Sequence, residues 1–161
     1  MKINTINITR ICNVVCALLM FALLVTQFLP FWSLDGQEVS IAGYIGFPED
    51  HMDYTQHFRK LLNDDGFGAG NIVLINVMIM LSSVVGTVLC LKNSDKTWPS
   101  IFPAVCGIAG LVQYIATPVF QLGCNWGLHL ALSTTTLFMA IATFVVWIRG
   151  QKIAKNSSGK L

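Results

Sequence analysis

Long stretches of this chain contain no charged residue. Residues 11–34 form an uncharged run of 24 residues, and residues 71–91 form a second of 21. Residues 97–148 contain no Asp, Glu, Lys or Arg over 52 positions, which is too long for one membrane span and suits two. Because about 20 apolar residues cross the hydrocarbon core of a bilayer, the pattern predicts an all-α membrane protein, an antiparallel bundle of four transmembrane helices. We place the helices at 11–32, 71–91, 100–120 and 127–148.

The first span has an alternative interpretation. A basic start followed by an apolar run is also typical of a cleaved signal peptide. The run is longer than a typical signal core, and no small-residue cleavage site follows it. Pro30, Phe31 and Trp32 instead indicate the exit of a span at an aromatic-rich membrane interface. A permanent span is therefore favoured.

The segment 33–70 carries seven of the eight acidic residues and two of the ten basic ones. Its Asp35-Gly36 dipeptide favours a tight hairpin, so the flanks 31–34 and 39–41 are predicted to pair as short strands. Further along, four apolar residues recur at helical spacing and predict a short amphipathic helix that caps the bundle or lies on the membrane. These residues are Tyr54, Phe58, Leu61 and Leu62.

The distribution of Lys and Arg predicts the orientation. The N-terminus 1–10 contains two, the turn 92–99 contains two, and the tail 149–161 contains four, against two in 33–70. Because Lys and Arg are enriched in cytoplasmic segments, both termini are predicted to be cytoplasmic. Segment 33–70 and the turn 121–126 then face outward, as in a multi-pass protein of the plasma (cell inner) membrane. We also expect the tail to be basic and flexible.

Composition supports a membrane protein and indicates how the spans associate. The chain is 54% hydrophobic and 11% charged, whereas soluble domains are about a quarter charged. Lipid tails supply no hydrophobic drive between helices, so small residues and internal polar groups must join them. Ser82 with Gly86, and Cys106 with Gly110, are small residues four apart and are expected at helix contacts.

Strong hydrogen-bonding side chains occur at similar depths in the four spans. Such groups are costly within a membrane and tend to face the bundle interior or a wet cavity. One interpretation is an outward-facing polar pocket; the other, which we favour, is a set of hydrogen bonds that join the helices. Asn76 and Gln113 match best in depth, and His129 is expected to be an interface residue rather than a ligand. The four residues are Gln27, Asn76, Gln113 and His129.

Other patterns argue against an enzymatic, metal-binding or nucleic-acid-binding function. The acidic and His residues near His51 and His57 match no established metal motif, and the five cysteines include no CxxC pair. No span contains Asp or Glu, no catalytic motif is present, and no basic patch with aromatic residues indicates a nucleic-acid partner. We therefore expect a non-enzymatic protein without a cofactor or metal.

The layout resembles that of claudin-type four-span proteins, with both ends inside, a long first outer loop and a short second one. The resemblance is one of architecture: Trp32 stands alone where claudins carry a Trp-Gly-Leu-Trp motif, the loop has no cysteine, and no functional residue is carried over. The expected role is contact with lipids, another membrane protein or copies of the chain. The alternative is an oligomeric channel or small-solute transporter.

Overall fold

Four long helices make up most of the molecule. The computed structural model describes residues 5–34, 37–40, 69–116, 123–124 and 126–158. The helices are α1 (Thr5–Thr26), α4 (Ala69–Lys92), α5 (Ile101–Ala116), preceded by the short η1 (Trp98–Ser100), and α6 (Trp126–Ser158). Four helical segments are long and apolar enough to cross a membrane. The predicted fold, a helical four-span membrane protein, is confirmed.

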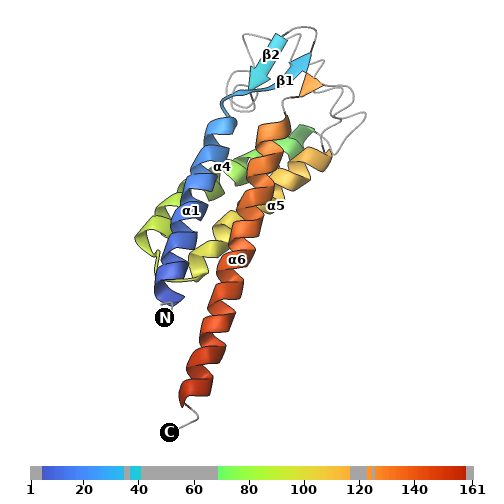
Figure 1. Cartoon of the computed structure of the whole chain (residues 1–161). Helices are drawn as coiled ribbons and strands as arrows, with labels where there is room; N and C mark the ends of the chain where they lie inside the picture. The colour runs from blue at the N-terminus through green and yellow to red at the C-terminus, as the bar shows by residue number, and fades with distance from the viewer. Residues whose placement is uncertain (1–4, 35–36, 41–68, 117–122, 125, 159–161) are drawn as a thin grey trace.

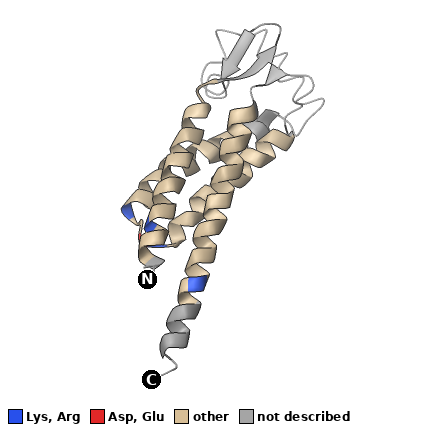
Figure 2. Ribbon diagram, in the orientation of Figure 1, with Lys and Arg blue, Asp and Glu red and all other residues tan. Residues whose placement is uncertain are grey.

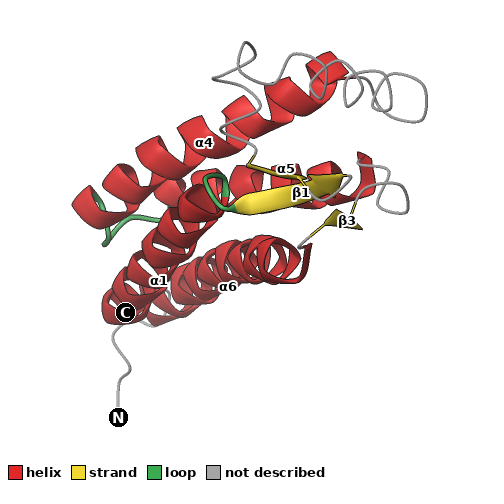
Figure 3. Ribbon diagram, turned by 90° about the horizontal axis from the view of Figure 1, so that it is seen from above, coloured by secondary structure: helices red, strands yellow, loops and turns green. Residues whose placement is uncertain are grey.

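The helices pack as a closed ring of neighbours. α1 lies against α4 and α6, and α5 lies against the same two helices on the opposite side (Figures 1 and 3). Both chain termini lie at one end of the bundle, which we call the terminal end, and the strands lie at the other, which we call the loop end (Figure 1). The short connections from α4 to α5 and from α5 to α6 favour antiparallel packing of these sequence neighbours.

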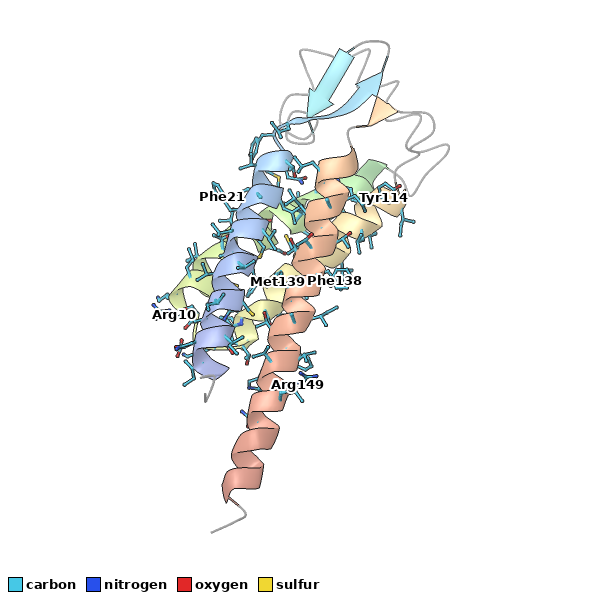
Figure 4. The ribbon with its side chains drawn as sticks, viewed as in Figure 1. Arg10, Phe21, Tyr114, Phe138, Met139 and Arg149 are labelled. Carbon is cyan, nitrogen blue, oxygen red and sulfur yellow. The ribbon has the colours of Figure 1, made fainter. Side chains whose placement is uncertain are left out.

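The outward faces of the helices are apolar, as lipid requires. Phe21 on α1 and Phe138 on α6 point away from the bundle, with 56% and 67% of their surfaces exposed (Figure 4). The interior is filled by a continuous cluster of buried side chains, including Met20, Leu23 and Ile79. The packing therefore separates a lipid-facing surface from a dense core.

The charged residues that are coloured in Figure 2 lie at the terminal end. Arg10 and Arg149 lie there (Figure 4), as do Lys92 at the end of α4 and Asp95 and Lys96 in the turn that follows it. The apolar middle of the bundle separates this charged end from the strands. This one-sided distribution agrees with the uncharged runs of the sequence.

A small sheet lies at the loop end. β1 (Pro30–Leu34) and β2 (Gln37–Ser40) pair antiparallel with Leu34 opposite Gln37, so the hairpin predicted around Asp35-Gly36 is present. β3 (Gly123–Cys124) adds to the other edge of β1, giving the order β2-β1-β3. The sheet thus joins the segment after α1 to the segment between α5 and α6. The predicted cap residues lie outside the described residues: Tyr54, Phe58, Leu61 and Leu62.

The first helix lies nearer the N-terminus than the uncharged run suggests. α1 begins at Thr5 and ends at Thr26, where the sequence indicated a span over 11–32. Pro30 disfavours helical geometry in the residue before it, and the chain becomes the strand β1 at Pro30. Arg10 is accommodated because it lies on the terminal end, where a long side chain reaches water.

The last helix is longer than expected. We expected a flexible tail over 149–161, but α6 continues to Ser158. The segment 149–158 contains no proline and includes good helix formers such as Arg149, Gln151 and Ala154. Basic residues also interact favourably with the C-terminal end of a helix dipole. The tail is therefore basic, as expected, but helical.

Small residues allow the helices to approach closely. A Cβ at Gly86 would lie 2.6 Å from Phe102 Cβ on α5 and 2.7 Å from Met20 Sδ on α1. A Cβ at Gly110 would lie 2.8 Å from Ser133 Cβ on α6. Both positions therefore require glycine, and Cys106 contacts Ser83 of α4, which confirms the expected helix contacts for Gly86, Cys106 and Gly110.

Candidate functional site

The polar residues singled out in the spans all lie inside the bundle near the loop end. Gln27, Asn76 and Gln113 have no exposed surface, and His129 is 1% exposed. Buried polar groups in a membrane protein need partners, because lipid offers none. Their hydrogen bonds therefore decide what this group can do.

Asn76 and Gln113 join α4 to α5. Gln113 Nε2 donates a hydrogen bond to Asn76 Oδ1 over 2.5 Å. A direct amide–amide bond of this kind joins two helices without a charge. The pairing expected from depth alone is therefore confirmed.

His129 joins the start of α6 to the end of α1. Its Nδ1 lies 3.3 Å from Thr26 Oγ1 and 3.5 Å from Gln27 Nε2. The first distance is slightly longer than the usual range of about 2.7–3.2 Å for a hydrogen bond, and the second is longer still. Thr26, which the sequence did not single out, is thus the nearer of these two partners of the histidine.

Thr26 and Gln27 also complete the end of α1. Thr26 Oγ1 donates to Leu23 O over 2.7 Å, and Gln27 Nε2 lies 3.3 Å from the same carbonyl oxygen. The last carbonyl groups of a helix have no partner within the helix, and leaving them bare in a membrane is costly. The side chains that contact His129 therefore also terminate the helix.

The two polar pairs are neighbours across the bundle. A Cβ at Gly110 on α5 would lie 3.6 Å from His129 Nε2. The imidazole of His129, on α6, therefore has its Nδ1 near α1 and its Nε2 near α5. Gln113 is three residues from Gly110 and shares its helix face. The structure therefore brings α1, α4, α5 and α6 together in one layer of polar groups, which we call the polar layer: Thr26, Gln27, Asn76, Gln113, His129 and Ser133.

Some atoms of the polar layer keep hydrogen-bonding capacity. Gln27 Oε1, Asn76 Nδ2 and Ser133 Oγ are buried and have no hydrogen-bond partner among the described residues. These atoms provide both donor and acceptor functions but no formal charge. The layer therefore offers neutral hydrogen bonding, and not the paired carboxylates of proton-coupled transport.

A second polar contact closes the terminal end, and sequence analysis did not single it out. Asn13 Nδ2 donates to Ser94 O over 2.9 Å and to Lys96 O over 2.6 Å. The side chain of Asn13 has no exposed surface. It therefore ties α1 to the turn that follows α4. The only signal in the sequence was its isolation as a strong polar residue in the inner half of a span.

Hydroxyl and thiol groups in the middle of the bundle have local partners. Ser83 Oγ and Cys106 Sγ lie 3.0 Å apart between α4 and α5. The hydroxyls of Thr134, Thr135 and Thr136 bond to the carbonyls of residues four positions earlier in α6. Threonine within a helix commonly bonds in this way. These groups stabilise the bundle and present no nucleophile–base pair.

Among the described residues, no three His, Cys, Asp or Glu side chains are grouped to hold a metal ion. The sequence cluster around His51 and His57 lies outside these residues. No family model matches the chain, and searches of curated proteins and of solved structures found no matching protein. The similarity to claudin-type proteins stays one of layout.

Proposed function

We propose that the protein is a non-enzymatic, multi-pass protein of the plasma (cell inner) membrane that acts through contacts with another membrane protein, its own copies or lipids. Both termini are cytoplasmic in this proposal, and the loop end faces outward. The loop end, where the sheet β2-β1-β3 lies, is then the part that meets outer partners.

One observation carries this proposal: several buried polar side chains within the spans bond to another helix or to the turn between two helices. Gln113 with Asn76 joins α5 to α4, and His129 with Thr26 joins α6 to α1. Asn13 bonds to the carbonyls of a turn. Polar groups that are used in hydrogen bonds between helices are not available to a solute. Such a bundle is suited to position the contact surface at the loop end rather than to conduct a solute.

Crosslinking in the native membrane tests this proposal. A photo-reactive amino acid placed at Gln37, on the edge strand β2, should form a discrete crosslinked species identifiable by mass spectrometry. The matched control is the same amino acid at the lipid-facing Phe138. Equal, diffuse crosslinking at both positions, with no discrete species, would contradict a contact function at the loop end.

A second candidate is an oligomeric channel or small-solute transporter with an outward-facing polar pocket. It is favoured by the remaining hydrogen-bonding capacity of Gln27 Oε1, Asn76 Nδ2 and Ser133 Oγ. Water or a neutral polar solute suits such atoms. Flux of neutral solutes into proteoliposomes distinguishes the candidates. Uptake that Asn76→Leu abolishes, without loss of folded protein, would favour the transporter.

A further inference from the structure

A groove lies at the terminal end, remote from the polar layer. It has a volume of about 410 Å³ and is formed by the start of α1, the turn before α5 and the late part of α6. Pockets for small molecules usually have volumes of about 300–1,000 Å³. Its lining residues are Ile6, Thr9, Asp95, Lys96, Thr97, Trp98, Trp147, Gly150 and Gln151.

The groove lies at the boundary of the membrane-crossing segments. Ile6 and Trp98 are the first residues of two such segments, and Gln151 is the last residue of a third. Residues at the ends of a span lie where the hydrocarbon core meets the lipid headgroups. Tryptophan is enriched at that level, and two of the lining residues are tryptophans. The groove therefore opens at headgroup depth.

The lining suits a phosphate group. Lys96 is exposed and supplies an ammonium group, while Thr97 and the two indole N–H groups are hydrogen-bond donors. Ionised donors form the stronger hydrogen bonds to phosphate oxygens. Ile6 and the indole rings provide an adjoining apolar surface. A ligand with a phosphate at one end and hydrocarbon at the other would use both parts of the lining.

The charge around the groove favours an anionic ligand. Of the lining side chains, Lys96 is basic and Asp95 is acidic. Three further basic side chains that the structure describes lie at this end without lining the groove, those of Arg10, Lys92 and Arg149, so the surroundings are net positive. Basic pockets between transmembrane helices are recurrent sites for anionic lipid headgroups. We propose that the groove binds an anionic glycerophospholipid, with its phosphate at Lys96 and its chains against the apolar lining. This inference rests on the lipid contact named in the proposed function and specifies it; its site lies at the terminal end, whereas the outer partners are proposed to meet the loop end.

Tryptophan emission reports on this groove. In a background with Trp32→Phe and Trp126→Phe, Trp98 and Trp147 are the remaining tryptophans, and both line the groove. The protein is placed in nanodiscs of phosphatidylcholine with rising fractions of phosphatidylglycerol. A saturable change in emission is expected, together with phosphatidylglycerol retained on the protein in native mass spectrometry.

Two charge-matched variants locate the site. Lys96→Gln should weaken the apparent affinity for phosphatidylglycerol about tenfold, because it removes a charged hydrogen bond. Lys92→Gln removes the same charge outside the lining and should change the affinity less than about twofold. Both side chains are exposed, so neither substitution opens the core. Equal losses in both variants, or no loss with Lys96→Gln, would overturn the proposal.

Two further binding measurements identify the class of ligand. Asp95→Asn removes the one acidic group of the lining and should tighten or preserve binding of phosphatidylglycerol. Weaker binding in that variant would point to an ammonium-bearing headgroup and would overturn the assignment. Glycerol 3-phosphate added to phosphatidylcholine nanodiscs should leave the emission unchanged. A saturable response to it would show that the groove takes a soluble phosphate instead of a lipid.

Discussion

Gln113 donates a 2.5 Å hydrogen bond to Asn76 in the interior of the bundle, and both side chains are completely buried. The bond links two helices that follow one another in the chain, near the end where their connections to the sheet begin. On the other side of the bundle, His129 and Thr26 link α6 to α1 at 3.3 Å. Each pair closes one side of the ring of four helices at the loop end.

The close contact between α5 and α6 predicts that Gly110 tolerates no side chain. Gly110→Ala places a Cβ 2.8 Å from Ser133 Cβ, so the helices must separate. Overpacking of this kind costs about 1–3 kcal/mol. Unfolding in mixed micelles measures the loss. Gly127→Ala is the matched control, because a Cβ there has no neighbour within 4 Å. Equal stability of the two variants would contradict the observed packing.

The contact of Asn13 with the turn after α4 predicts a local effect at the terminal end. Asn13→Leu removes the donor that bonds to Ser94 O and Lys96 O and should cost about 1–3 kcal/mol. Hydrogen exchange should become faster across 93–97 than in the wild type. Asn93→Ala is the control. The side chain of Asn93 makes only a long contact of 3.5 Å, to Leu89 O of the preceding helix turn, so its loss should have little effect. Unchanged exchange in Asn13→Leu would show that the turn 93–97 is stable without the hydrogen bonds of Asn13.

The orientation is tested by labelling single cysteines in a chain whose five native cysteines are replaced. Cysteines at positions 36, 50 and 64 should react with an impermeant reagent added from outside. Cysteines at 94 and 155 should react only after the membrane is opened, because eight of the ten basic residues belong to that side. Labelling of position 155 in intact cells would reverse the orientation.

The sequence predicted those features that depend on composition and local pattern. Runs without charge defined four spans, and the Asp35-Gly36 dipeptide predicted the hairpin that pairs Leu34 with Gln37. Depth along a span was enough to pair Asn76 with Gln113, because helical rise is constant. Each of these inferences uses only properties of single segments.

Features that depend on distant backbone atoms had no signature in the sequence. The partners of Asn13 are carbonyl groups, which every residue carries, so residue types do not reveal them. The pairing of β1 with β3 joins segments that are separated in the chain by α4, η1 and α5. At the end of α1, Thr26 and Gln27 contact Leu23 O, and a hydropathy pattern does not record that contact.

The most direct test of the central claim, that polar groups within the spans join the helices, is a double-mutant cycle on Asn76 and Gln113. Asn76→Leu, Gln113→Leu and the double variant are unfolded in mixed micelles and compared with the wild type. Interhelical hydrogen bonds in membranes average about 0.6 kcal/mol and reach about 1.7. We predict a coupling free energy in that range, with each single variant less stable than the wild type. Additive effects, or a gain of stability in Gln113→Leu alone, would contradict the claim and favour a water-lined pocket.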